Sequence, residues 1–255
     1  GSRDEGLRYV GVDSDAVNHG WLCDRGRFNF EAVKSEHRVL QPLVREGDEL
    51  LPASWNTALA AAAALITEAK AAGGVAGIAV IGGARGTNED AFAWARVGHE
   101  VIGTPNVYSQ MGDGLPVGLL GLDRATIDEA ANATALVRRG PDLKEELPVL
   151  YLRLRDAAAK QRSRIIELTP KHTGLTRNAW RSIGYEPGTQ VAAVQGALAD
   201  GAIAAQLAKG NVVIVAGRAN LAESSAATIA ALHALLAAVP GAKVLPAFRR
   251  GNVVG

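Results

Sequence analysis

Five short apolar runs, each followed by residues typical of a helix, constrain the fold of this chain more than any other feature of its sequence. The runs lie near residues 78, 135, 166, 213 and 244, and the one at 211–216 contains the strand-forming string Val-Val-Ile-Val. Alternation of buried strands with helices is typical of an α/β domain. We therefore predict an α/β fold with a mostly parallel sheet flanked by helices and joined by right-handed crossovers.

Capping and terminating residues place helices between these runs. Ser54 is suited to accept a hydrogen bond from the free amides of a first helical turn. Thr87 with Asp90, and Thr126 with Glu129, have the spacing of capping boxes. The predicted helices span residues 55–72, 89–101, 126–131, 148–160, 188–207 with a break near residue 200, and 224–238.

Residues 3–50 differ from the rest of the chain. They are polar, and their apolar residues occur in short runs such as Val39-Leu40 and Leu43-Val44. We predict short strands and turns there, without a core of their own. The sequence thus divides into a small β-rich N-terminal appendage, residues 1–50, and an α/β domain, residues 51–255.

The charge balance excludes one broad class of function. The chain has 27 Lys and Arg residues against 26 Asp and Glu residues, a formal net charge of +1 at pH 7. No excess of positive charge is available to neutralise phosphates, so we expect no nucleic acid partner. No apolar run reaches about 18 residues and no signal peptide opens the chain, so we expect no direct insertion into a membrane.

Cys23 is the only cysteine in the sequence. It cannot form an internal disulfide, which suits a reducing, cytosolic compartment. It also cannot hold an iron–sulfur cluster or a structural zinc by itself, because each needs about four ligands. The five histidines are scattered, without a pair at i, i+4 spacing. We assign no catalytic residue.

The glycine-rich loop Gly82-Gly83-Ala84-Arg85-Gly86 follows a predicted strand and leads into a predicted helix. Phosphate binds at helix N-termini in this context, but the loop matches neither common nucleotide-binding pattern. Glu89 and Asp90 in the first helical turn stabilise the helix dipole and would repel a phosphate. We favour helix capping over ligand binding at this loop.

Other notable residues have ordinary structural interpretations. Trp55 and Trp94 lie at helical positions and are expected in the core. Asp113 in its glycine-rich loop is expected to form a turn. Residues 142–146 are expected to form a solvated turn and a helix start.

Several segments resemble a known family. Residues 17–28, Val-Asn-His-Gly-Trp-Leu-Cys-Asp-Arg-Gly-Arg-Phe, are similar to the N-G-x-L-C-x-K-G-R-F segment of the molybdopterin oxidoreductase superfamily. Residues 82–90 resemble the G-G-A-R-x-T-N-E-D loop of the G-subunit family of bacterial NADH-quinone oxidoreductases, respiratory complex I. Further similar stretches lie at residues 103–107, 112–116, 140–148, 152–155 and 249–252. The resemblance covers about residues 7–255.

The resemblance implies a Rossmann-like fold inside a larger electron-transfer subunit. In the family, the segment around Cys23 supplies the fourth ligand of a [4Fe–4S] cluster whose other three cysteines precede it, and the sequence here begins after them. Cys23 is thus a ligand by resemblance only and is not competent in this fragment. Residues 1–50 correspond to a remnant of the iron–sulfur (4Fe-4S) subdomain. Residues 51–255 correspond to a molybdopterin oxidoreductase-like domain truncated at its C-terminus.

The resemblance implies that the complex I branch keeps this fold without the pterin, so we expect no cofactor in the fragment and no molybdopterin. The acidic residues Asp142, Glu145 and Glu146 agree, because an anionic dinucleotide needs donors or cations. The implied function is that of a structural, non-catalytic domain of the iron–sulfur G subunit, which passes electrons from NADH through iron–sulfur clusters toward quinone. The implied partners are other peripheral-arm subunits of complex I, in the cytoplasm on the inner face of the plasma membrane.

A domain cut from a larger subunit is expected to expose apolar side chains and to self-associate. The candidate residues are Leu7, Tyr9, Trp21, Phe28, Val253 and Val254. Two alternatives stay open. One is a fragment of a true molybdopterin-dependent oxidoreductase, formate dehydrogenase-like; the other is an independent nucleotide-binding α/β protein.

Overall fold

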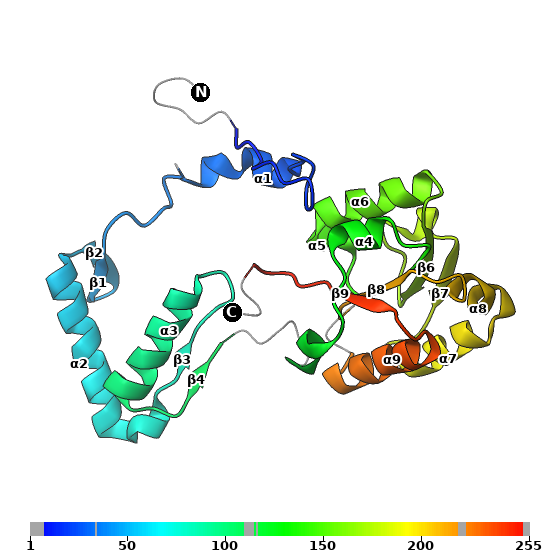
Figure 1. The fold of residues 1–255 in the computed structure, drawn as a ribbon. Helices are drawn as coiled ribbons and strands as arrows, with labels where there is room; N and C mark the ends of the chain where they lie inside the picture. The colour runs from blue at the N-terminus through cyan, green and yellow to red at the C-terminus, as the bar shows by residue number, and fades with distance from the viewer. Residues whose placement is uncertain (1–7, 34, 110–114, 116, 219–222, 252–255) are drawn as a thin grey trace. The chain divides into compact units, whose positions relative to one another are not determined.

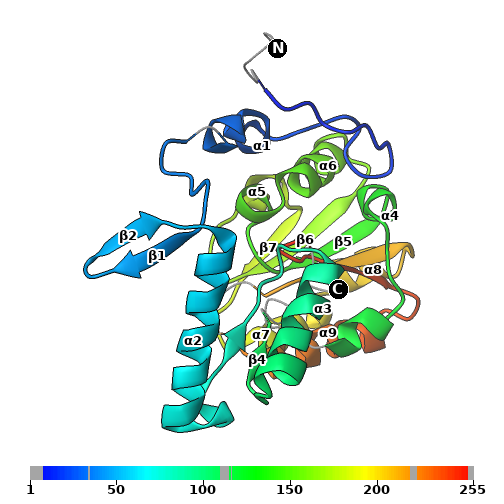
Figure 2. The same cartoon turned by 90° about the vertical axis from the view of Figure 1, so that its left-hand side faces the viewer.

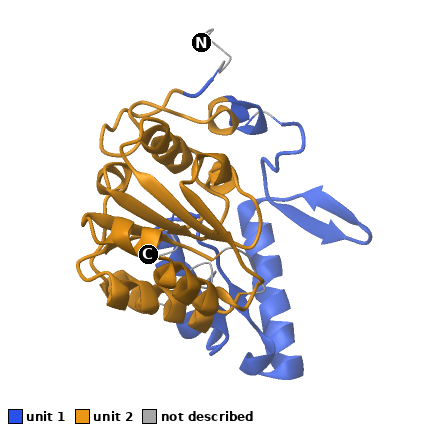
Figure 3. Ribbon diagram, turned by 90° about the vertical axis from the view of Figure 1, so that its right-hand side faces the viewer, with its two compact units in different colours: residues 1–9, 28–110, 250–255 blue, residues 10–27, 111–249 orange. Residues whose placement is uncertain are grey.

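The computed structural model describes residues 8–33, 35–109, 115, 117–218 and 223–251. The chain divides into two compact units (Figure 3). Unit 1 comprises residues 1–9, 28–110 and 250–255, and unit 2 comprises residues 10–27 and 111–249. Each unit is therefore assembled from segments that are distant in the sequence.

Unit 2 is built around a parallel sheet of five strands (Figure 1). The strands lie in the order β7-β6-β5-β8-β9, and each neighbouring pair is parallel. Their bounds are Ala135–Arg139 for β5, Arg164–Thr169 for β6, Arg181–Gly184 for β7, Val212–Ala216 for β8 and Lys243–Pro246 for β9. The predicted α/β fold with a parallel sheet flanked by helices is confirmed.

Helices cover both faces of this sheet (Figures 1 and 2). Side chains such as Leu136 and Val213 pack against α4, α5 and α6, and their strand neighbours Val137 and Ile214 pack against α7, α8 and α9. Successive side chains of a strand point to opposite faces, so a sheet buried on both faces needs nearly continuous apolar strands. The helix bounds are Ile127–Ala131 for α4, Leu143–Glu146 for α5, Pro148–Ala159 for α6, Gln190–Ala199 for α7, Gly201–Leu207 for α8 and Ser225–Ala238 for α9.

The N-terminal segment of unit 2, residues 10–27, is anchored to α6 by one buried side chain. Arg153 is 5% exposed and donates to the main-chain oxygens of Val17 at 3.0 Å and Asp15 at 3.4 Å. It also forms an ion pair with Asp128 of α4. The side chain of Asn18 ties the segment into a compact turn through three hydrogen bonds to its main chain. The anchor therefore joins parts of the chain that are far apart in sequence.

Unit 1 contains a β-hairpin, a two-stranded parallel sheet and two longer helices. The hairpin pairs β1 (Leu43–Glu46) with β2 (Glu49–Pro52), and the parallel sheet pairs β3 (Val80–Ile81) with β4 (Val107–Tyr108). Helix α2 spans Trp55–Gly73 and is capped by Ser54, as predicted. Helix α3 spans Asn88–Arg96 and continues as the π-helix Val97–Ile102. The 3-10 helix Asn29–Val33 precedes the hairpin in unit 1. The short helix α1 (Asp24–Phe28) lies at the boundary, with Asp24–Arg27 in unit 2 and Phe28 in unit 1.

Some elements differ from the sequence-based predictions. Strand β3, expected near residue 78, pairs with β4 and does not join the five-stranded sheet. Strands β4 and β7 were not predicted. The placement of Trp55 and Trp94 in the core is wrong, since they are 70% and 56% exposed. The reason is that none of the residues of α2 or α3 is buried, because a two-stranded sheet offers little surface to cover them.

The two compact units divide the chain at other places than residue 50. The predicted division into residues 1–50 and 51–255 is a correspondence to subdomains of the family. The compact units do not test that correspondence, so it stays a prediction. The N-terminal stretch contains β1 and the first residues of β2, in line with the predicted short strands, and also two short helices.

The predicted exposure of apolar side chains is confirmed for Tyr9, Trp21 and Phe28. Leu7, Val253, Val254 and Asp113 lie outside the described residues. Within the described ranges, no helix is both long enough and apolar enough to cross a membrane.

Candidate functional site

The carboxyl edge of the five-stranded sheet is the candidate site. The chain runs outward from β5 through β6 to β7 on one side, and through β8 to β9 on the other. Neighbouring strands β5 and β8 therefore flank the point where the strand order reverses. In open parallel sheets, ligands bind outside the carboxyl ends of the strands at this point. The relevant loops are residues 140–142 after β5 and residues 217–218 after β8.

These two loops touch each other through their backbones. A Cβ added to Gly140 would lie 2.9 Å from the Cα of Gly217, and one added to Gly217 would lie 2.5 Å from the Cδ of Pro141. The amide of Gly217 also donates to the carbonyl oxygen of Arg139 at 2.8 Å. Glycine is required at both positions, and at Gly140 also because its φ is +154°. Among the described residues, the two loops are therefore in close contact directly beyond the ends of β5 and β8.

A buried ion pair lies on the α4–α6 side of this edge. Arg138 of β5 and Glu167 of β6 are 1% and 0% exposed, and Nη1 of the arginine lies 2.9 Å from the carboxylate. Nη2 of Arg138 donates to the carbonyl oxygens of Gly140 and Pro141. Burial lowers the pKa of Arg138, and the carboxylate of Glu167 opposes this shift. The guanidinium thus binds the loop that a ligand would otherwise contact.

The carboxylate of Glu167 has three further donors. The hydroxyls of Thr173, Thr176 and Ser182 donate to it at 2.5, 2.7 and 3.2 Å. These residues come from the connection between β6 and β7 and from β7 itself. A fully buried carboxylate is tolerated when its charge is paired and its lone pairs are hydrogen-bonded, as here.

A second buried ion pair lies on the α7–α9 side. Arg139 donates to Glu223 at 2.8 Å, to the carbonyl oxygen of Gly217 at 3.1 Å and to Thr228 of α9 at 3.4 Å. Glu223 is 0% exposed and also accepts from the hydroxyl of Tyr185 at 2.5 Å. Burial and the hydrogen bond to Glu223 raise the pKa of Tyr185, so its hydroxyl stays protonated. The two neighbouring arginines of β5 therefore place one neutralised pair on each face of the sheet.

Sequence reasoning did not identify this arrangement. Neither Arg138 nor Arg139 was predicted as a functional residue. A signal was nonetheless present, because two arginines at the end of one apolar strand and a glutamate inside another indicate buried ion pairs.

Asp142 and the acidic residues after it form a helix start, as predicted. The carboxylate of Asp142 caps α5 through the amide of Lys144 at 3.0 Å and also accepts from the amide of Gly174 at 3.2 Å. Leu143 of the same run is buried, whereas the prediction was a solvated turn. These acidic groups place negative charge beside the Gly140 loop.

The glycine loop of unit 1 is closed by its own capping box. Thr87 Oγ1 accepts from the amide of Asp90 at 3.2 Å, and the Asp90 carboxylate accepts from the amide of Thr87 at 2.9 Å. A backbone hydrogen bond lowers the pKa of Glu89, so a second negative charge lies in the same turn. A cavity of about 360 Å³ adjoins the loop, and Arg85, Asp90, Trp94 and Tyr108 contribute to its lining. The predicted capping box is confirmed, and its charges disfavour a phosphate at this helix start.

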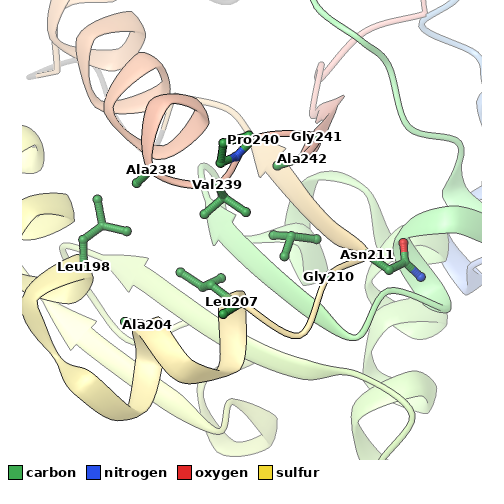
Figure 4. Close-up of a pocket in the computed structure, with 12 residues that line it drawn as sticks. Leu198, Ala204, Leu207, Gly210, Asn211, Ala238, Val239, Pro240, Gly241 and Ala242 are labelled. Atoms are coloured by element: carbon green, nitrogen blue, oxygen red, sulfur yellow. The ribbon is translucent and has the colours of Figure 1, made fainter.

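A further cavity lies at the amino edge of the sheet of unit 2 (Figure 4). It has a volume of about 440 Å³, and Leu198, Leu207 and Val239 contribute apolar walls. Among the residues that line this cavity, Asn211 has the polar side chain, and its amide donates to the carbonyl oxygen of Asn132. None of its lining side chains is titratable, so this cavity offers no group for acid–base or nucleophilic chemistry.

Cys23 immediately precedes helix α1 and is partly exposed. Its sulfur accepts a weak hydrogen bond from the amide of Gly26 at 3.5 Å. Among the described residues, no group of three or more His, Cys, Asp or Glu side chains could hold a metal ion. The residues of this chain therefore do not fit a [4Fe–4S] cluster, which needs about four ligands.

Comparison with known proteins identifies the family of this chain. The model of the molybdopterin oxidoreductases matches residues 38–244. The chain belongs to the molybdopterin oxidoreductase family. The G subunit of NADH-quinone oxidoreductase from Mycobacterium tuberculosis is 32% identical over 83% of this chain and 27% of that relative. NADPH-Fe(3+) oxidoreductase subunit alpha of Geobacter sulfurreducens is 30% identical over 74% of this chain and 23% of that relative.

A solved structure has a similar fold. Acetylene hydratase from Pelobacter acetylenicus matches with a TM-score of 0.55 at 19% identity, over 78% of this chain and 30% of that chain. At this identity the likeness concerns the fold alone. The chain spans about a quarter of the length of the two curated relatives named above.

The family name implies a pterin cofactor, and the described residues at the carboxyl edge of the five-stranded sheet do not fit one in dinucleotide form. Gly140 and Pro141 after β5 contact Gly217 after β8, so these residues occupy the space directly between the two strand ends. Arg138 and Arg139 are each neutralised by a buried glutamate, so they offer no charge to a pyrophosphate.

Proposed function

We propose that this chain is the α/β domain of a G subunit of NADH-quinone oxidoreductase and that its role there is structural. The observation that carries the proposal is the closed carboxyl edge of the sheet, where Gly140 meets Gly217 and two ion pairs are buried. A domain whose buried arginines at this edge are already paired with glutamates can still act as a rigid body that holds neighbouring parts of a larger protein. The 32% identity to the G subunit of Mycobacterium tuberculosis supports this choice within the family.

In this proposal the whole protein passes electrons from NADH through iron–sulfur clusters toward quinone. Its partners are the other peripheral-arm subunits of complex I, at the cytoplasmic, inner face of the plasma membrane. Cys23 is the fourth [4Fe–4S] ligand of the whole subunit, and residues 1–50 belong to the subdomain that carries that cluster. The chain by itself is non-catalytic, binds no cofactor and self-associates through exposed apolar side chains such as Trp21 and Phe28.

Calorimetric titration tests the absence of a dinucleotide site. We expect no saturable heat when the 255-residue chain is titrated with NADH or with a molybdopterin dinucleotide. A dissociation constant below about 10 μM, roughly −7 kcal/mol, for either compound would contradict the proposal, because it would require a site that the closed edge does not provide.

Iron content tests the role of Cys23. After anaerobic reconstitution with iron and sulfide, the chain and a Cys23→Ala variant should retain the same low background of iron. About four irons per chain in the wild type, lost in Cys23→Ala, would show that this chain builds a cluster by itself and would overturn the assignment of a single ligand.

A further inference from the structure

An arginine–tryptophan–arginine cluster lies at the amino edge of the sheet of unit 2. The guanidinium carbon of Arg164 lies 5.1 Å from the ring centroid of Trp180, and that of Arg181 lies 4.4 Å from the same centroid. Arg164 is the first residue of β6, and Arg181 is the first residue of β7. Two cations therefore share one indole at the edge opposite to the buried ion pairs.

Trp180 is a firmly placed platform for these cations. Its amide donates to the carbonyl oxygen of Ile165 at 2.8 Å, and its side chain packs partly buried against the apolar cluster of the α7–α9 face. Both arginines are exposed. Stacking on an aromatic face orders a guanidinium before any partner arrives, which reduces the entropy lost on binding.

The two stacked arginines have no carboxylate partner among the described residues. Arg181 donates to the carbonyl oxygen of Trp180 at 3.2 Å, and neither Arg164 nor Arg181 forms an ion pair there. The positive charge extends along the chain, because Arg162 and Lys160 share the single carboxylate of Asp156 at 2.7 and 3.0 Å. We call Lys160, Arg162, Arg164 and Arg181 the basic strip. It is a local excess in a chain whose net charge is only +1.

We propose that Trp180 with Arg164 and Arg181 forms a docking site for an acidic segment of another protein. The planar fork of each guanidinium matches a carboxylate through two parallel hydrogen bonds. Tryptophan and arginine are also the residues that most often dominate binding at protein interfaces. The site goes beyond the proposed function and does not depend on the family of the chain. A protein segment is favoured over nucleic acid because the platform is one indole, not a series of stacking rings along a basic groove.

The indole signals in a 1H–15N correlation spectrum test this site directly. The chain has four tryptophans, and the signal of Trp180 is assigned from its loss in Trp180→Phe. Hexaglutamate peptide serves as the probe at low ionic strength, with hexalysine as the charge-reversed probe. We expect hexaglutamate to shift the Trp180 signal in a saturable manner and to leave the Trp21 signal in place. Hexalysine should shift neither signal.

Glutamine substitutions identify the cations that bind. Arg164→Gln and Arg181→Gln should each weaken hexaglutamate binding about threefold, and the double variant about tenfold. Arg177→Gln is the matched control, since Arg177 is an exposed arginine of the same β6–β7 connection with no ring contact or ion pair among the described residues. Arg164→Lys and Arg181→Lys keep the charge and lose the planar fork, and they should bind more weakly than wild type if stacking matters.

Three results would overturn the docking site. The first is an unshifted Trp180 signal at saturating hexaglutamate. The second is an equal loss of affinity in Arg177→Gln, which would make the binding a non-specific charge effect. The third is tighter binding of a single-stranded oligothymidylate at the same signal, which would assign the strip to nucleic acid. None of these results bears on the dinucleotide titration, so this site and the proposed function can fail independently.

Discussion

Glu167→Gln is the most informative single substitution in this fold. The change keeps the shape of the side chain and removes the negative charge that compensates Arg138. The arginine is 1% exposed and cannot recover hydration without opening the sheet edge. Glu167 also accepts from Thr173, Thr176 and Ser182, whereas a glutamine amide presents one oxygen and one NH2 group to the same donors.

The expected loss is large because an unpaired charge stays buried. Breaking a buried pair by removing one partner costs about 3–5 kcal/mol. The free energy of unfolding of a domain is about 5–15 kcal/mol. A loss of this size should therefore leave the variant only marginally stable. Asp156→Asn is the control, because its ion pairs with Lys160 and Arg162 are solvent-exposed and worth at most about 1 kcal/mol.

Urea denaturation followed by far-ultraviolet circular dichroism measures the effect. The double variant Arg138→Met with Glu167→Leu removes both charges and should recover much of the loss, since apolar replacement of a buried pair is often neutral or stabilising. A Glu167→Gln stability within about 0.5 kcal/mol of wild type, or a double variant no better than the single one, would refute the view that burial of the charge governs this site.

Three further predictions follow from the geometry. Gly217→Ala should destabilise unit 2 by about 1–3 kcal/mol by overpacking against Pro141, while Gly196→Ala in open space on α7 should stabilise by about 0.5–1 kcal/mol; equal midpoints in urea would contradict the close approach of the two loops. In a spectrophotometric pH titration, Tyr185 should ionise only on unfolding, because its pKa is raised by burial and by Glu223, and this late step should disappear in Tyr185→Phe. The hydrogen bond from Lys243 holds the pKa of Glu129 below its ordinary value of 4.5, so its contribution to stability is present above that pH and is lost as the pH falls through the folded-state pKa; Glu129→Gln should lower the melting temperature at pH 7 and leave it unchanged at acidic pH, and an equal lowering at both would contradict this linkage.

The elements that were predicted correctly are those specified by local chemistry. Helix α2 begins at a serine cap and α3 begins at a capping box, and both signals lie within four residues of the helix start. Strand β8 consists of four β-branched residues followed by Ala216. In contrast, β7 reads Arg-Ser-Ile-Gly and is a strand only because β6 pairs with it. A sequence read locally does not contain that pairing.

The candidate site depends on contacts between distant residues. Arg138 finds its partner 29 residues away, and Arg139 finds its partner 84 residues away. Charged residues in isolation are expected at the surface, so the apolar run near residue 135 did not indicate that β5 continues through Arg138 and Arg139. The exposure of Trp55 has a related cause, because periodicity predicts a helix but not the size of the sheet available to cover it.

The anchor between Arg153 and Val17 can form only after Arg153 of α6 has been synthesised. The two residues are 136 positions apart, and ribosomes extend chains at about 5–20 residues per second, so the N-terminal segment waits about 7–27 s before its docking arginine is made. During this interval the main-chain oxygens of Asp15 and Val17 lack the guanidinium that binds them in the folded chain. Nascent chains stalled before and after α6 should therefore differ sharply in protease cleavage within residues 10–27, and equal cleavage in both would show that the segment folds without its anchor.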